Sequence, residues 1–147
     1  MRISKKCQYA LKALFELAWR DNGQPVKTRS VADAQRMSLR FTEIILNELK
    51  HGGFVESKRG SEGGYLLTRD ARNLTIGEVV EYVQGPISFV PDAKGASDGA
   101  LLGSDAFGQL WQEVSDAVSS VCGRKTFADL VELEQAKRER SVPNYCI

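Results

Sequence analysis

The stretch from Ser38 to Tyr65, SLRFTEIILNELKHGGFVESKRGSEGGY, constrains the fold of this 147-residue chain more than any other. Ser38 is a favoured helix N-cap residue, and the segment from Leu39 to Lys50 carries apolar side chains at helical spacing. The predicted inward stripe consists of Phe41, Ile45, Leu46 and Leu49. The opposite face holds polar side chains with the reach to contact bases and phosphates, namely Arg40, Glu43, Asn47 and Lys50.

A basic hairpin follows this helix. Gly52 and Gly53 predict the helix end, because glycine adopts left-handed dihedrals at little cost. Phe54-Val55 begins a strand, and Tyr65-Leu66-Leu67 forms the returning one. The hairpin tip between them contains Lys58, Arg59, Gly60, Gly63 and Gly64. A helix followed by a basic β-turn is the order of elements in a winged helix-turn-helix.

Two helices precede this stretch. The first is predicted from about Ser4 to Trp19, and the second begins near Thr28, which we expect to be its N-cap. The second helix leads through Arg36-Met37 directly to Ser38, and two helices joined this closely match helix-turn-helix geometry. A short helix from Leu74 to Val83, with the capping-box pair Thr75 and Glu78, completes a domain over residues 1–84.

The rest of the chain has a different character. Residues 85–104 are rich in Gly, Ala, Ser, Asp and Pro, a composition that predicts a flexible, sensor-type loop. Residues 105–147 are predicted to hold a long helix, a final helix and a tail. The long helix, Ser104 to Cys122, has an apolar stripe with little intramolecular core to cover it, so we predict a homodimer interface, with packing inside one subunit as the alternative. The stripe consists of Phe107, Leu110, Trp111, Val114, Val118 and Val121. Thr126 is predicted to cap the last helix, Phe127 to about Arg138. The expected fold class is mainly α with a small β wing.

Charge divides the chain in the same way. Residues 1–70 carry 13 Lys and Arg and 8 Asp and Glu, which gives a net charge of +5. Residues 71–147 carry 7 Lys and Arg and 11 Asp and Glu, which gives a net charge of −4. A basic front half suits a DNA-binding lobe. Without an apolar run of roughly 18–20 residues or a signal-peptide cleavage site, we expect a cytoplasmic protein with no membrane partner. No nucleophile–base pair or phosphate loop is evident, so we do not expect an enzyme.

The combined motifs resemble the Rrf-two family of bacterial transcription regulators. The resemblance covers residues 1 to about 134 and includes MRISKKCQYALKALFELA, VKTRSVA, SLRFTEIILNELKHGGFV, KRGSEGGYLL, LTIGEVV, LWQEVSDAV and TFADLV. It implies an intertwined homodimer, in which each subunit has a winged helix-turn-helix and a long C-terminal dimerisation helix. It also implies a regulator, most often a repressor, that binds a palindromic operator in double-stranded DNA.

The resemblance also implies DNA contacts. The recognition-helix positions that match those of the family are Ser38, Arg40, Phe41 and Glu43, and the wing position is Arg59, before Gly60. These residue types fit independently, since Arg pairs with guanine or enters a narrow minor groove and Glu accepts from cytosine. We add Thr28, Lys5 and Lys58 as expected phosphate contacts. As an alternative role, Glu43 would pair with Arg40 or Lys50 in solvent.

The chain departs from the family at the sensor. Relatives that bind a [2Fe-2S] cluster use three closely spaced cysteines and one further ligand before the dimerisation helix, but residues 85–104 contain neither Cys nor His. A standard three-Cys cluster is therefore not expected, although an unusual cluster using Cys7 and the other subunit's Cys122 stays open.

Redox sensing at Cys7 also stays open. Lys5 and Lys6 are expected to lower the pKa of Cys7, although an inert cysteine is favoured there. The remaining signal is a small-molecule or protein effector, docked near Phe89, Phe107 and Trp111.

Two classes of function thus compete. One is a dimeric DNA-binding regulator, and the other is a winged-helix module that binds a protein instead of DNA. Salt dependence separates them, because binding to phosphates weakens steeply as salt rises.

Overall fold

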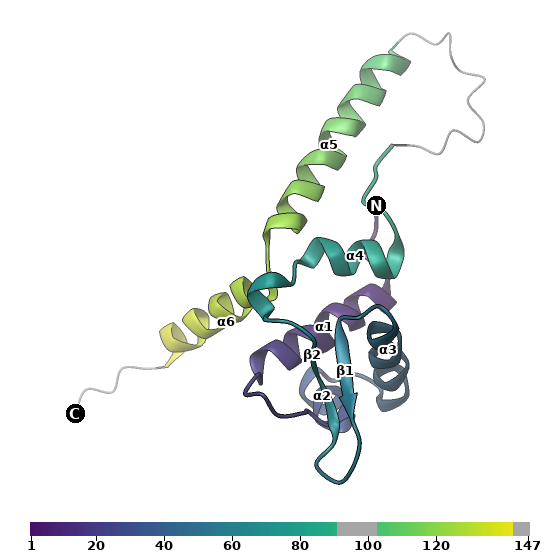
Figure 1. Ribbon diagram of the computed structural model, residues 1–147. Helices are drawn as coiled ribbons and strands as arrows, with labels where there is room; N and C mark the ends of the chain where they lie inside the picture. Colours follow the sequence, from purple (N-terminus) through teal and green to yellow (C-terminus); the bar gives the residue numbers. More distant parts are fainter. Residues whose placement is uncertain (91–102, 143–147) are drawn as a thin grey trace.

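The computed structural model describes residues 1–90 and 103–142, and these residues form six α-helices, one short 3₁₀ helix and a two-stranded sheet. Figure 1 shows a mainly helical lobe from which the β-hairpin and α5 extend at opposite ends. The elements are α1 (Lys5–Trp19), α2 (Thr28–Gln35), α3 (Leu39–His51), β1 (Val55–Lys58), β2 (Gly64–Leu67), η1 (Ala71–Asn73), α4 (Ile76–Gln84), α5 (Ser104–Arg124) and α6 (Phe127–Ser141). The predicted fold class, mainly α with a β wing, is confirmed.

One core fills the lobe. Helix α1 runs through its centre and buries Ala10, Ala13, Leu14 and Leu17, whose spacing places them on one face. Helix α3 covers that face, and its Leu46 and Leu49 are fully buried. The core also receives Phe127, the first residue of α6, which is fully buried and fixes the start of that helix to the lobe.

The inward face of α3 differs from the predicted one. Phe41 is 55% exposed, and Thr42 takes the inward position instead, donating its hydroxyl to the carbonyl oxygen of Ser38 at 2.8 Å. The reason is the helical period: positions 42, 45, 46 and 49 form one stripe, and Phe41 falls about 100° to its side. Ser38 is the N-cap, as predicted, but its side chain makes no capping hydrogen bond.

The turn between α2 and α3 is short. Arg36 has φ 51°, a left-handed conformation, and the Met37 N–H donates to the Ala32 carbonyl at 2.8 Å. Thr28 was predicted to cap α2, but the N-cap is Lys27, whose side chain makes no capping bond, and Thr28 is the first helical residue. The chain bends one residue earlier because Val26 pairs with the wing.

Helices α4 and α6 begin as predicted. Thr75 with Glu78 and Thr126 with Asp129 form complete capping boxes, and Thr75 and Thr126 also meet in an isolated β-bridge. A Cβ on Gly77 would lie 3.1 Å from the Gly123 nitrogen, so α4 and α5 pack backbone against backbone here. The last helix runs past the predicted Arg138 to Ser141.

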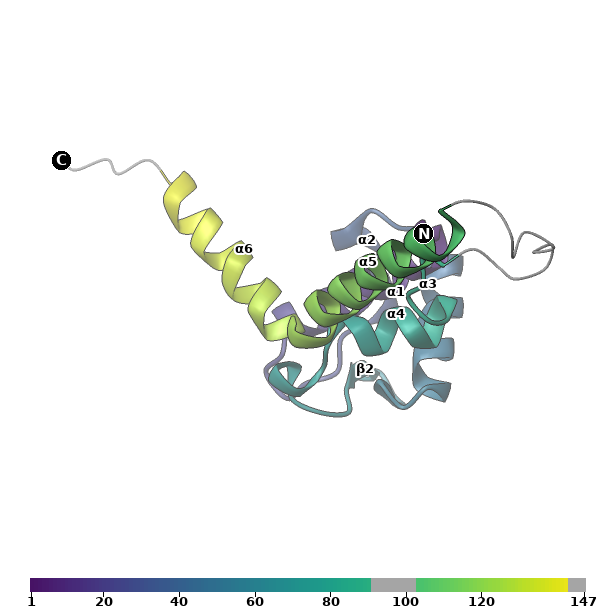
Figure 2. The same ribbon diagram turned by 90° about the horizontal axis from the view of Figure 1, so that it is seen from above.

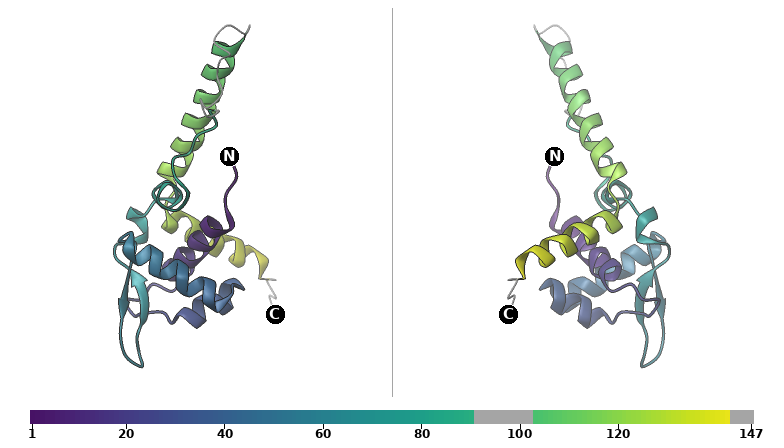
Figure 3. Two further views of the ribbon diagram at one scale, coloured as in Figure 1. Left: turned by 90° about the vertical axis from the view of Figure 1, so that its right-hand side faces the viewer. Right: turned by 90° about the vertical axis from the view of Figure 1, so that its left-hand side faces the viewer.

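Beyond this crossing α5 leaves the lobe. Figure 3 shows it as an arm whose Ser104 end is far from the helices of the lobe, and Figure 2 shows α6 leading away in another direction. Of the 21 residues of α5 only Ser115 is buried. Among residues 1–90 and 103–142, no helix has the length and apolar character needed to cross a membrane.

The start of the predicted 85–104 loop packs against this arm. Ile87 is buried, and the Phe89 N–H donates to the Ser115 hydroxyl at 2.8 Å. This explains why Ser115 is the buried residue of α5. The remainder of the predicted loop, residues 91–102, and the tail from 143 with Cys146 lie outside the described residues.

Candidate nucleic-acid interface

The wing is an antiparallel hairpin held at its base by a third segment. Val55 pairs with Leu67 and Lys58 with Gly64, which leaves residues 59–63 as the tip. Val26 joins this sheet through two hydrogen bonds with Tyr65, both 2.8 Å. Gly64 is required here, because it has φ 154° and a Cβ would collide with the Val26 carbonyl. The wing and the start of α2 are therefore one rigid unit.

The exposed face of α3 carries the predicted base-contacting residues. Arg40 and Glu43 are exposed, and within the described parts of the chain neither takes part in an ion pair. The alternative pairing of Glu43 with Lys50 is not found, since the Lys50 ammonium donates to the Ser57 hydroxyl of β1 at 2.7 Å. This contact fixes the end of α3 to the wing. Both charges on α3 thus face solvent and are available to a ligand.

The wing tip presents cations. Lys58 lies 3.3 Å from Glu56 but is largely exposed, and Arg59 and Gly60 are exposed, with φ 108° at Gly60. In Figure 1 this tip extends beyond α2 and α3 at the end of the lobe opposite α5. A guanidinium at the end of a narrow hairpin has the reach to enter a groove beside the one occupied by a helix.

Sequence reasoning missed two cations at the start of α2. Lys27 and Arg29 are exposed and flank the partly buried Thr28, at a helix N-terminus whose N-cap side chain makes no bond. Amide N–H groups and cations together favour phosphate. The signal was available in VKTRSVA, but it was obscured by assigning the cap to Thr28.

A buried carboxylate fixes α2 to α1. Glu16 is 5% exposed and accepts from the Arg20 guanidinium at 2.6 Å and from the Gln35 amide at 2.7 Å. Gln35 is the last residue of α2, so this bond holds the end of the helix just before the turn into α3. No sequence pattern indicated it, because Gln35 and Glu16 are 19 residues apart.

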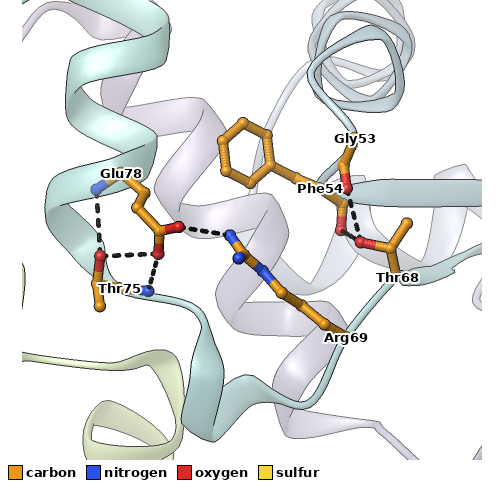
Figure 4. Close-up of polar contacts among 6 residues, drawn as sticks. All are labelled: Gly53, Phe54, Thr68, Arg69, Thr75 and Glu78. Carbon is orange, nitrogen blue, oxygen red and sulfur yellow. Dashed lines mark hydrogen bonds and ion pairs between the residues drawn. The ribbon is translucent and has the colours of Figure 1, made fainter.

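A second set of contacts joins α3 and the wing to α4. The Tyr82 hydroxyl donates to the Glu48 carbonyl at 3.0 Å, and its ring packs edge-on against Phe54 at 5.2 Å. Figure 4 shows the Thr68 hydroxyl on the carbonyls of Gly53 and Phe54, and next to it Arg69 reaching Glu78 at 2.8 Å. The hydrogen bond from the Thr75 N–H, with contributions from its hydroxyl and from Arg69, lowers the pKa of Glu78.

Other predicted residues lie elsewhere. Lys5 is exposed at the start of α1, and Lys6 pairs with Glu48 at 2.7 Å.

On α5, Phe107 is 61% exposed and Trp111 36%, while Val114 and Val118 are partly buried. Phe89 is partly buried against a small cluster around Cys7, Val80 and Ile87.

The expected lowering of the Cys7 pKa by its lysine neighbours is wrong. Its side chain is fully buried, and burial raises the pKa of the thiol instead of lowering it. Lys5 is exposed and Lys6 pairs with Glu48, and neither lysine offsets the loss of hydration at the buried thiol. Cys122 is partly buried against the same cluster.

The donor set does not fit a three-Cys iron–sulfur cluster. Among residues 1–90 and 103–142, no three His, Cys, Asp or Glu side chains come together as a metal site. Residues 85–104 supply no Cys or His at all, whatever their conformation. Fully buried Cys7 also lacks the access that a ligand on an exposed loop would have.

Similarity to known proteins shows the family of this chain. The profile of the Rrf2 family, described as iron-dependent transcriptional regulators, matches residues 3–133. The chain belongs to the Rrf2 family. The sequence-based resemblance is thereby confirmed, and the chain is a DNA-binding transcription regulator.

The relatives of this Rrf2 chain are named as regulators. The transcriptional regulator CymR of Bacillus subtilis is 30% identical over 95% of this chain and 96% of its own length. Rv1287 of Mycobacterium tuberculosis, a putative regulator, is 35% identical over 88% and 81%. IscR of Escherichia coli O1:K1 is 30% identical over 92% and 83%. That relatives are regulators agrees with the prediction that the chain is not an enzyme.

Solved structures give the same fold. The chain matches CymR, the global cysteine regulator of B. subtilis, with a TM-score of 0.79 at 30% identity, over 90% of this chain and 98% of that one. It matches T. potens IscR with a TM-score of 0.75 at 26% identity, over 99% and 95%. The match to T. potens IscR concerns the fold.

Proposed function

We propose that this Rrf2 regulator is a cytoplasmic homodimer that represses transcription by binding a palindromic operator. The observation that carries the proposal is the pair of exposed charges on α3, Arg40 and Glu43, next to a wing that ends in Lys58 and Arg59. In each subunit α3 would enter the major groove and Arg59 the adjacent minor groove. Ser38, Phe41 and Gly60 complete the base-side surface.

Phosphate contacts would surround this surface. Thr28 at the start of α2 and Lys5 at the start of α1 are the predicted ones, and Lys27 and Arg29 extend the set. Two symmetric copies would present two α3 helices to half-sites one helical turn apart, about 34 Å. Such a site is palindromic, because a two-fold protein binds a two-fold operator.

The dimer would form through α5. Four side chains of its apolar stripe, Phe107, Leu110, Trp111 and Val121, are exposed among the described residues, and exposed apolar side chains of this size favour association. Val114 and Val118 continue the stripe toward the lobe. We propose further that the signal is a small molecule or a protein partner, because the residues present do not fit a three-Cys cluster.

The experiment begins with selection of bound sequences from a randomised duplex library. On the selected duplex, Arg59→Ala and Glu43→Ala should each weaken binding by about 1–3 kcal/mol per lost base contact. Arg72→Ala and Glu132→Ala are matched controls, since both side chains are exposed and lie away from α3 and the wing tip. Unchanged affinity of both test variants in a gel-shift titration would reject the proposed surface.

A further inference from the structure

One cation on the polar face of α3 is held by the wing. Lys50 follows Arg40 by ten positions, which places it about 15 Å farther along the helix axis. A recognition helix contacts base edges mainly with its first residues, so Lys50 lies far from the end that reads bases. Its ammonium donates to the Ser57 hydroxyl of β1 at 2.7 Å. The ammonium is thus directed toward the base of the wing.

The strand period places Ser57 on the inner face of the wing. Val55 is buried and Ser57 partly buried, whereas Glu56 and Lys58 are exposed and lie 3.3 Å apart as an ion pair. Side chains alternate along a strand, so Val55 and Ser57 share the face that is turned to the lobe. In Figure 1 this strand runs beside α3. The Ser57 hydroxyl therefore lies where a long side chain from α3 can reach it.

The Lys50 contact completes a row across the base of the wing. Ser57 pairs with Tyr65 of β2, and Tyr65 exchanges two hydrogen bonds of 2.8 Å with Val26, just before α2. The row therefore runs from α3 through both strands to the start of α2. Arg59 lies two residues beyond Ser57, at the tip. A two-stranded hairpin has little stability of its own, so contacts at its base decide where its tip points.

We propose that Lys50 is a positioning residue for Arg59: by holding Ser57 it sets the direction in which the wing enters the minor groove, and thereby the bases that Arg59 reads. This inference rests on the proposed function and adds a residue that determines specificity without contacting a base. The gain from inserting a guanidinium depends on the width of the groove at the point of entry. A wing held at its base enters at one point, whereas a loosened wing does not distinguish one width from another.

The test repeats the selection from the randomised duplex library with the intact chain and with Arg59→Ala, Lys50→Met and Ser57→Ala. The positions at which Arg59→Ala relaxes the base preference are those that the wing reads. We expect Lys50→Met and Ser57→Ala to relax the preference at the same positions and to retain it where Arg40 and Glu43 read. The loss of a phosphate contact, in contrast, weakens binding almost uniformly across sequences.

Affinities on the selected duplex measure the coupling. Lys50→Met should weaken binding about fivefold per subunit, the effect of one hydrogen bond. The effect should be much smaller when Arg59 is already alanine, because the two changes then remove the same contact. Lys50→Arg should keep the parent preference, since a guanidinium also donates to the Ser57 hydroxyl. Lys137→Met, at an exposed position of α6, is the matched control for the loss of charge and should leave the preference unchanged.

The same data include the results that would overturn the inference. If Arg59→Ala relaxes the wing positions but Lys50→Met and Ser57→Ala do not, the proposed DNA surface stands and Lys50 does not position it. If Lys50→Met lowers affinity uniformly, or relaxes the preference when Ser57→Ala does not, Lys50 contacts DNA directly. A parent chain that selects no sequence overturns the inference together with the proposed function.

Discussion

The DNA-binding lobe and the α5 arm use apolar residues in opposite ways. In α1, seven of fifteen residues are buried within the same subunit, whereas in α5 one of twenty-one is, and that one is a serine. Both helices have an apolar stripe at helical spacing, so periodicity alone does not distinguish them. The lobe thus folds on its own contacts, while four apolar side chains of α5, Phe107, Leu110, Trp111 and Val121, are exposed among the described residues.

The largest effect should come from the lobe. Leu46→Ala removes a fully buried side chain from the core and should lower the free energy of unfolding by about 2–5 kcal/mol. Phe107→Ala is the matched change in the arm and should shift it by less than about 0.5 kcal/mol in dilute, monomeric protein. Urea unfolding followed by circular dichroism compares the two. Equal effects would mean that α5 packs within its own subunit.

The arm should dominate association instead. Leu110→Glu places a charge in the proposed interface, twice per dimer, and should weaken dimerisation by about 2 kcal/mol or more. Sedimentation equilibrium measures this directly, and the unfolding of the lobe should hardly change. Gln109→Glu adds the same charge on the opposite face as a control. If both variants dimerise as the parent does, the interface lies elsewhere.

A smaller effect is expected where the two regions join. Glu78→Gln removes the carboxylate of the α4 capping box and should cost about 0.5–1 kcal/mol at pH 7, at the lower end because the side chain is exposed. The pKa of Glu78 is lowered in the folded state, so its stabilisation is fully present above the unfolded pKa of about 4.3. It is lost as the pH falls through the lowered folded value. The difference in unfolding free energy between the two proteins should therefore shrink as the pH falls below about 4.3, and a difference that stays constant from pH 7 to pH 3 would contradict this assignment.

The smallest effect concerns the contact between α3 and α4. Tyr82→Phe removes the hydroxyl that donates to the Glu48 carbonyl but retains the ring against Phe54. We expect a loss of about 0.5 kcal/mol in unfolding free energy, low for a hydrogen bond because the side chain is partly exposed. Tyr82→Ala, which also removes the ring, should cost more. Identical values for the two variants would assign the whole effect to the hydroxyl and none to the ring.

Local signals were sufficient for most of the fold. The capping boxes of Thr75 and Thr126, the glycines of the hairpin and the stripe of α1 each fix their element through contacts within four residues, so the sequence was enough. Thr28 and Phe41 were misplaced because tertiary pairing moved them: Val26 joins the wing, and the α1 face selects Thr42 as the inward residue of α3. The predicted lowering of the Cys7 pKa was wrong for a related reason. The neighbouring lysines in the sequence do not indicate that Cys7 is buried under α4 and Ile87. The Glu16–Gln35 bond joins residues 19 positions apart and was not predicted.

The salt dependence of binding to the selected duplex tests the central claim most directly. If the lobe binds DNA through α3 and a cationic wing, log K should fall linearly with log salt, with a slope of about −0.9 for each phosphate neutralised. Lys58→Ala should reduce the slope by about two such units per dimer, one from each subunit. A steep slope that Lys58→Ala makes shallower is the predicted result. A slope near zero, unchanged by the substitution, would contradict the account, because binding would then not depend on neutralised phosphates.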